Sequence, residues 1–420
     1  MTRRERLTLF LLLCSICLWS QRRPQPVEIP SYPCLHTDRG QDSLRFPGSH
    51  ERFDSLYRRL DTLLVEGRGN VNILHIGGSH VQSGDFSHRM RTHFATFTSH
   101  PGNRGMLFPF TALKTNAPQN YAMWHEGAWS GARCVKPDAA LPLGLSGACV
   151  ETSDTLARIF LSMNSLSEWR TDTLRILGEG SQDTVVPMLL CGSDTLSPLP
   201  SDGYAGFRFA LLPETDTCAL FFPGLHDENV SFRLRGIMPE GRLSGITYTA
   251  SGINGASVPS WLKCELFTDE LSLVKPDLVV FGIGINDANV LPQRFNPEQF
   301  KSNYRRLIER IRMVNPACCF IFITNNDCWF NVRGRRRQFN TNTPRVQQAM
   351  TELAREYDGA VFDAFALMGG LRSSNAWVKA GLQRADHIHF TRQGYELWGD
   401  LLYNAVVNDF LLATQTPEEP

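Results

Sequence analysis

Residues 71–80 read VNILHIGGSH. An apolar run of this length, rich in β-branched residues, predicts a buried strand, and the two glycines after it predict a turn that opens a helix. A second stretch of this kind, DLVVFGIGIND at residues 277–287, also leads from an apolar run into glycines and polar side chains. Nearly continuous apolar runs are typical of parallel strands, which are buried on both faces. The two stretches therefore predict an α/β fold.

Helical and strand patterns alternate around these stretches. Asn296 and Pro297 illustrate a helix start, with a capping side chain followed by proline at the first helical position. The apolar spacing predicts helices at 51–66, 84–95, 297–313, 344–357 and 392–410, and further strands at 245–250, 318–324 and 360–362. Such alternation predicts a parallel sheet between two layers of helices.

The sequence pattern changes between about residues 110 and 245. Short alternating segments are separated by turn residues, as in Ser201-Asp202-Gly203, and no helical period is sustained. This pattern predicts an all-β sandwich inserted into the α/β domain. The expected divisions are an α/β domain at 51–110 and 246–412, an inserted β-sandwich domain at 111–245, and a tail at 413–420.

The N-terminus predicts export. Three arginines at positions 3, 4 and 6 precede an apolar or small run of thirteen residues, Leu7 to Trp19. This run is shorter than the roughly 20 residues that span a bilayer, but it suits a secretory signal peptide at 1–20. A proline-rich extended lead-in is expected at 21–50. We expect a periplasmic or secreted protein that meets the membrane only through this segment; an uncleaved N-terminal anchor is the alternative.

Composition limits the partners. The 420 residues include 42% hydrophobic residues, which excludes wholesale disorder. Lysine plus arginine and aspartate plus glutamate each number 42, and without a basic excess no nucleic-acid partner is expected. Cys134 with Cys149, and Cys191 with Cys218, are candidate disulfide pairs by proximity, although sequence does not determine connectivity.

Four polar segments could carry chemistry. They are Gly77–His80, Ser251–Ser257, Gly282–Asp287 and Asp386–Phe390, and the first three follow predicted strands. Ligands bind outside the carboxyl ends of strands in open α/β sheets. Each segment alone has a structural alternative, such as a helix cap or an Asx turn. Another alternative is a metal-binding cluster in which Asp386 and His389 are joined by His75, His80 and His88. The spacing of these residues gives it no support.

Together the four segments resemble the SGNH hydrolase superfamily, the GDSL-type esterases. The blocks occur in the family's order as Gly77–His80, Asn254-Gly255, Gly284–Asp287 and Asp386–His389. The resemblance implies a flavodoxin-like parallel sheet between helices. It is closer to secreted bacterial peptidoglycan and polysaccharide O-acetylesterases, which share the histidine of His80 and a carbohydrate-binding-like β insertion.

The resemblance also implies roles for individual residues. Ser79 would be the nucleophile, His389 the base and Asp386 the carboxylate that orients it. The backbone N–H groups of Ser79 and Gly255 and the side chain of Asn286 would form the oxyanion hole. The implied reaction is hydrolysis of O-acetyl esters on an acetylated polysaccharide, with no metal and no organic cofactor.

Three further features bear on this expectation. Trp124 and Trp129 are candidate platforms for sugar rings or, alternatively, part of the sandwich core. Gly78 stands where the family has an aspartate, so a catalytically impaired carbohydrate-binding protein is one alternative, and a lipase or thioesterase on the same triad is another. The basic cluster at residues 333–337 could face an anionic polymer or be a solvated loop.

Overall fold

The computed structural model describes residues 23–37, 40, 42–98, 100–203, 206–330 and 338–414. The expected signal peptide at 1–20, the basic cluster at 333–337 and most of the expected tail lie outside the described residues. Within the described part of the chain, no helix combines the length and apolar character needed to cross a bilayer.

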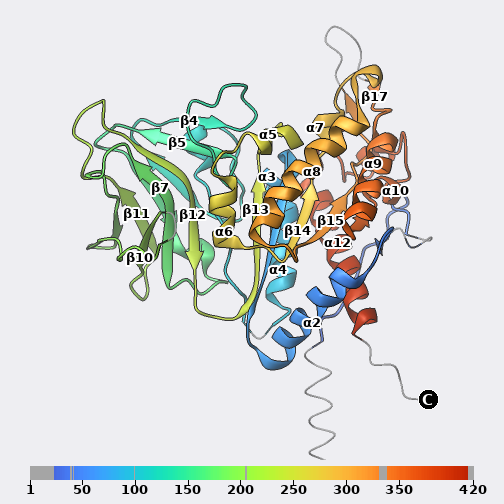
Figure 1. Ribbon diagram of the computed structural model, residues 1–420, viewed down its shortest axis with the longest axis horizontal. Helices are drawn as coiled ribbons and strands as arrows, with labels where there is room; N and C mark the ends of the chain where they lie inside the picture. The colour runs from blue at the N-terminus through green and yellow to red at the C-terminus, as the bar shows by residue number, and fades with distance from the viewer. Residues whose placement is uncertain are drawn as a thin grey trace, which may run out of the picture.

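A six-stranded main sheet forms the centre of the α/β domain (Figure 1). All neighbouring strands are parallel except β1, which pairs antiparallel with β18 at one edge. In spatial order the strands are β1 (Leu44–Arg45), β18 (Ala360–Phe362), β15 (Cys319–Ile323), β14 (Leu278–Gly282), β2 (Asn70–Gly77) and β13 (Gly245–Gly252). The five parallel strands, numbered along the chain, therefore follow the flavodoxin-like order 2-1-3-4-5.

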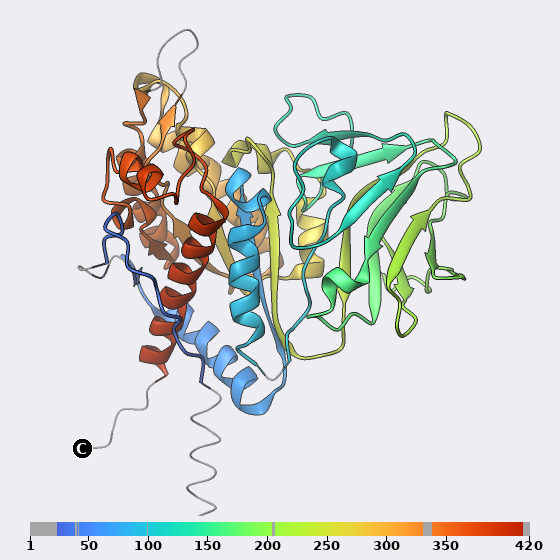
Figure 2. The same ribbon diagram turned by 180° about the vertical axis from the view of Figure 1, so that it is seen from behind.

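Helices cover both faces of the main sheet, because successive side chains of each strand point to opposite faces and both sets are apolar. On β2, Val71 and Ile73 pack into one buried cluster and Leu74 and Ile76 into the other. The first cluster includes α2 (Glu51–Glu66), α4 (Asp85–Ala95) and α12 (Arg392–Ala413), and the second includes α6 (Phe267–Val274), α8 (Pro297–Val314) and α9 (Thr343–Tyr357). Figures 1 and 2 show these two helical layers from opposite sides.

The inserted domain consists of two five-stranded antiparallel sheets, which lie to one side of the main sheet (Figure 2). One contains β10 (Phe207–Ala210), β7 (Thr173–Gly180), β12 (Phe232–Glu240), β5 (Ala148–Thr152) and β4 (Ser130–Arg133). The other contains β3 (Met123–Glu126), β6 (Arg158–Ser162), β11 (Thr217–Phe221), β8 (Met188–Cys191) and β9 (Asp194–Leu196).

A buried ion pair joins the insert to the α/β domain. Arg235 on β12 donates to Glu270 on α6 at 2.6 Å, and both side chains are almost fully buried. The other carboxylate oxygen of Glu270 accepts the N–H of Leu145 at 2.7 Å. Moving the insert away from α6 would separate the two charges and leave each of them buried without a partner, which is strongly destabilising. The pair therefore holds the insert in place against α6.

The structure confirms the predicted fold class, an α/β parallel sheet with an inserted β sandwich. It adds elements that the sequence patterns did not predict. Strand β1 lies within the segment expected to be an extended lead-in, and α5 (Val258–Leu262), α10 (Ala364–Leu367) and α11 (Ser374–Lys379) are short helices in segments left unassigned. Neither candidate cysteine pair forms a disulfide, because all four cysteines are buried free thiols. Cys191 and Cys218 nevertheless face each other on β8 and β11, with their sulfurs 3.2 Å apart.

Candidate active site

Three adjacent strands bring the first three polar segments together. Gly77 on β2 is in register with Gly252 on β13 and Gly282 on β14, so the residues after these glycines emerge at the same sheet edge. The short helix α3 (Ser79–Gln82) packs directly on this edge. A Cβ at Gly77 would lie 2.2 Å from the Val81 side chain, which explains why glycine is needed there.

Ser79, His389 and Asp386 form a continuous hydrogen-bonded chain. The Oγ atom of Ser79 lies 2.8 Å from Nε2 of His389, and Nδ1 of the same ring lies 2.9 Å from Oδ2 of Asp386. Ser79 begins α3, whereas the other two residues lie in the turn before α12. The structure therefore brings together the three residues that the resemblance assigned to the triad, in the order that proton transfer from a serine requires.

Asp386 is held as a carboxylate. Burial raises the pKa of Asp386, but hydrogen bonds from the His389 ring and from the backbone N–H groups of His389 and Ile388 outweigh burial and hold that pKa below its ordinary value. Oδ1 accepts both backbone donors at 2.9 Å, so Oδ2 is left to bind the ring. The aspartate thus fixes the ring so that Nε2 faces Ser79.

The three expected oxyanion donors surround the same cavity. The Nδ2 atom of Asn286, on α7 (Ile285–Ala288), donates to the carbonyl of Ala256 at 2.9 Å, which leaves one amide hydrogen for a ligand. Gly255 has φ of +81°, a conformation that favours glycine. Among the described residues, the N–H groups of Ser79 and Gly255 donate to no protein acceptor.

Two further side chains brace this arrangement: Gln82, which the sequence did not single out, and Asp287, the last residue of the third block. Oε1 of Gln82 accepts the N–H of Asn254 at 2.6 Å, so α3 holds the loop that carries Gly255. Asp287, next to Asn286, accepts the N–H of Val258 at the start of α5. Burial raises the pKa of Asp287 to about 7. These contacts tie the second and third segments to α3, the helix that Ser79 begins.

The remaining histidines do not gather into a metal site. Nδ1 of His80 lies 2.8 Å from the Tyr395 hydroxyl, and burial together with repulsion from His389 lowers the pKa of His80 to about 3. His387 stacks on Trp329 with ring centroids 4.1 Å apart and contacts Ser374. His75 is buried against Tyr248. Within the described residues, no group of three or more histidine, cysteine or acidic side chains is placed to bind a metal.

The cavity at the sheet edge has a volume of about 600 Å³. Besides the triad serine and histidine, it is lined by polar groups of the insert, including Asn116 and Gln119, and by Arg384. Asn116 also accepts from Nε2 of Gln82 through its carbonyl at 2.9 Å. The site is therefore built on the α/β domain and walled on one side by the first loop of the insert.

The two tryptophans occupy different environments. Trp124 on β3 is 42% exposed, and one face of its ring stacks on Phe160. It lines a second hollow of about 580 Å³, which shares Ala117 and Gln119 with the cavity above Ser79. Trp129 instead packs edge-on against Phe222 and donates to the Glu126 carbonyl. Only Trp124 therefore adjoins the site.

Gly78 lies against the side-chain amide of Asn286. A Cβ there would lie 3.3 Å from Nδ2 of Asn286 and 3.4 Å from the carbonyl oxygen of Ala256, so Asn286 would have to shift by a few tenths of an ångström. The φ of −98° and ψ of −137° at Gly78 lie outside the main α and β regions. The departure from the family pattern therefore places glycine, and no carboxylate, beside the Asn286 amide.

Comparison with known proteins supports the expected family resemblance. Residues 235–397 match the GDSL-like Lipase/Acylhydrolase family. This range contains the last three of the four blocks, while the Ser79 block lies before the insert. No curated protein sequence matches the chain significantly.

A solved structure of a peptidoglycan O-acetylesterase has the same fold over most of the molecule. It is 20% identical, with a TM-score of 0.68 over 88% of this chain and 99% of that chain. An acetyl xylan esterase is 18% identical over 39% of this chain and 81% of its own, with a TM-score of 0.31. A GDSL-like lipase from Bacteroides thetaiotaomicron is 17% identical over 40% and 76%, with a TM-score of 0.29. The chain therefore shares the fold of the first of these structures.

Proposed function

We propose that this chain, with its GDSL-like acylhydrolase domain, is an exported serine esterase that removes O-acetyl groups from a polysaccharide of the bacterial cell wall or a similar polymer. The observation that carries the proposal is the 2.8 Å contact between Ser79 Oγ and His389 Nε2 at the mouth of a polar cavity. A serine and a base within hydrogen-bond reach, with the base oriented by a third group, mark an activated nucleophile.

The reaction proceeds through an acyl-enzyme. Ser79 Oγ attacks the ester carbonyl as His389 Nε2 takes its proton, and the ring then gives that proton to the departing sugar hydroxyl. The resulting acetyl-serine is attacked by water, whose proton passes to the same nitrogen and then to Ser79 as acetate leaves. Asp386 stabilises the imidazolium in both halves, and its hydrogen bonds to Ile388 and His389 keep it ionised.

The negative charge on the carbonyl oxygen is stabilised by donors that are already in place. The N–H groups of Ser79 and Gly255 have no described protein acceptor, and Asn286 has a spare amide hydrogen. Because Gln82 and Asp287 hold the two loops, the donors need not reorganise as charge develops. Such preorganised donors commonly give the largest single contribution to acyl-transfer catalysis.

The surroundings favour a polymer over a long acyl chain. Asn116, Gln119 and Arg384 line the cavity and offer amide and guanidinium groups to sugar hydroxyls. The hollow at Trp124 adjoins the cavity above Ser79 and offers an exposed aromatic face. A second sugar ring of the same polymer could stack on this face. A lipase would need an apolar channel instead. Export, inferred from residues 1–20, would place the enzyme beside such polymers.

Release of acetate tests the proposal. Purified protein should hydrolyse p-nitrophenyl acetate and release acetate from O-acetylated peptidoglycan, acetylated xylan or acetylated pectin, with one polymer preferred. Preference for long-chain esters over acetyl esters would instead favour a lipase or thioesterase.

Two variants complete the experiment. Ser79→Ala should abolish both activities and keep an unchanged circular dichroism spectrum. Ser83→Ala, which changes a serine of the same cavity whose hydroxyl donates to the His80 carbonyl, should retain them. Equal rates in Ser79→Ala and the unaltered protein would overturn the proposal.

A further inference from the structure

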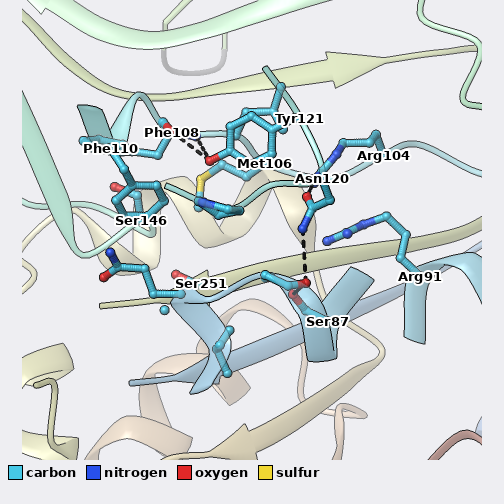
Figure 3. Close-up of a pocket in the computed structure, with 17 residues that line it drawn as sticks. Ser87, Arg91, Arg104, Met106, Phe108, Phe110, Asn120, Tyr121, Ser146 and Ser251 are labelled. Atoms are coloured by element: carbon cyan, nitrogen blue, oxygen red, sulfur yellow. Dashed lines mark hydrogen bonds between the residues drawn. The ribbon is translucent and has the colours of Figure 1, made fainter. Parts of the chain in front are cut away.

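A separate, smaller cavity lies between the α/β domain and the insert. Figure 3 shows its lining, with Arg91 from α4 and Arg104 from the segment that leads into the insert. Its volume is about 30 Å³. A volume of this size has room for one or two water molecules or one monatomic ion.

The two arginines are buried without a carboxylate. Each is only 2% exposed, and among the described residues neither forms an ion pair. Nε of Arg91 donates to the Tyr248 carbonyl at 3.1 Å, and Arg104 donates to the side chain of Asn120. Nη1 of Arg91 and Nε of Arg104 are buried and have no partner in the described part of the protein. The acceptors that are present are neutral, so two positive charges stay uncompensated.

Neighbouring groups offset these charges only weakly. The guanidinium carbon of Arg104 lies 5.0 Å from the centre of the Tyr121 ring, and that of Arg91 lies 5.9 Å from the Tyr248 ring. Glu168 attracts Arg91 from the surface but forms no ion pair with it. His88 lies outside the cavity lining, and burial together with repulsion from Arg91 and Arg104 lowers the pKa of its ring to about 4.

Both guanidinium groups are nevertheless charged. Burial lowers the pKa of Arg104 to about 10, and burial together with repulsion from Arg104 lowers the pKa of Arg91. A guanidinium does not lose its proton in proteins near neutral pH. Since an unpaired buried charge is strongly destabilising, two of them side by side require a counter-charge.

We propose that this cavity binds one small monovalent anion of the size and charge of chloride, held between Arg91 and Arg104. A water molecule could accept hydrogen bonds from the unpartnered N–H groups, but it is neutral and would leave both guanidinium charges uncompensated. Acetate, with four non-hydrogen atoms, exceeds the cavity. Because Arg104 lies in the entry to the insert and Tyr248 on β13, the anion joins the insert to the edge of the main sheet.

Bromide locates the site directly. Crystals of the unaltered protein grown or soaked in sodium bromide should show an anomalous peak between Arg91 and Arg104. A cavity that holds only water, with no anomalous peak at a bromide concentration of about 0.5 M, would overturn the proposal.

Thermal unfolding supplies the second test. At constant ionic strength, replacing sodium gluconate with sodium chloride should raise Tm by about 2 °C or more, since a ligand that binds only the folded state stabilises it. Arg104→Met should remove this increment. Arg305→Met, which removes a surface ion pair with Glu356, is the matched control and should keep it. Identical Tm values in the two salts, or an increment that Arg104→Met retains, would contradict the proposal.

Discussion

The carboxyl edge of the main sheet and the hollow at Trp124 differ in how their side chains are held. At the edge, Ser79, His389 and Asp386 are each fixed by a hydrogen bond, and Asn286 is fixed by the Ala256 carbonyl. In the hollow, Trp124 stacks on Phe160 and leaves much of its surface exposed. Under the proposed function, the edge carries the chemistry and the hollow contacts a sugar ring of the polymer. Changes at the edge should therefore affect every ester, and changes in the hollow only a polymer.

Ser79→Ala should have the largest effect. Without the nucleophile, kcat/KM for both p-nitrophenyl acetate and an acetylated polymer should fall by about 10³-fold or more, because the remaining groups act only as a unit with it. Steady-state assays on both substrates measure this. The replacement His389→Ala should match it, whereas His387→Ala, which changes the neighbouring histidine on Trp329, should leave most activity. If activity depended on His387 and not on His389, the assignment of His389 as the base would be wrong.

Asn286→Ala should lower kcat for both substrates by about 10²–10³-fold, the usual effect of losing one oxyanion donor. Asn289 lines the same cavity, so Asn289→Ala is the matched control and should cost much less. If Asn286→Ala and Asn289→Ala lowered kcat equally, Asn286 would only shape the cavity. The oxyanion would then be stabilised by the N–H groups of Ser79 and Gly255 alone.

Asp287 should make stability depend on pH. Its folded-state pKa of about 7 lies above the ordinary value of 3.8, so it favours folding below pH 3.8 and loses that contribution as pH rises to about 7. Over this window the unfolding equilibrium constant should increase by up to about tenfold per pH unit. Asp287→Asn should remove this slope in urea unfolding, and Asp269→Asn on the surface of α6 should not. A slope unchanged by Asp287→Asn would show that other groups cause it.

Trp124→Ala should distinguish the role of the hollow from that of the sheet edge. Losing the aromatic face should weaken use of an acetylated polymer by about tenfold in kcat/KM, equivalent to about 1.4 kcal/mol of contact, and leave p-nitrophenyl acetate unchanged. Trp129→Ala should instead lower Tm, because Trp129 packs on Phe222. Equal losses on both substrates would mean that Trp124 supports the edge and does not contact the polymer.

Gly78→Asp should have the smallest effect, a change of about threefold or less in kcat. The added Cβ needs Asn286 to shift by only a few tenths of an ångström. A large gain in activity would identify Gly78 as the cause of an impaired enzyme and favour the carbohydrate-binding alternative for the natural protein.

The sequence predicted the main sheet and its helices well because their patterns are long and local. The helix expected at 51–66 is Glu51–Glu66, and the one expected at 297–313 is Pro297–Val314. The sequence pattern does not predict β4 individually, because SGAR contains one apolar residue and the strand lies at the edge of its sheet, so its burial does not alternate. Strand β1, of two residues, depends entirely on pairing with β18.

The reactive residues could be predicted because each lies in a short motif, whereas their supports could not. Gln82 and Asn116 hold the site through contacts with residues distant in sequence, and no local pattern marks such partners. Asp287 lies in the third block, but its contact with the N–H of Val258 could not be predicted from that motif. The same holds for Arg91 and Arg104, which look like ordinary surface arginines until the fold buries them together.

Covalent labelling of the serine tests the central claim most directly. A fluorophosphonate reacts with a serine whose proton a neighbouring base can take, so the intact protein should gain the mass of one phosphonyl group, and peptide mapping should place it on Ser79. The same reagent should leave Ser83 unmodified and should label the His389→Ala variant at least about 10²-fold more slowly. Labelling elsewhere, no labelling, or equal rates in the two proteins would contradict the assignment of Ser79 and His389 as nucleophile and base.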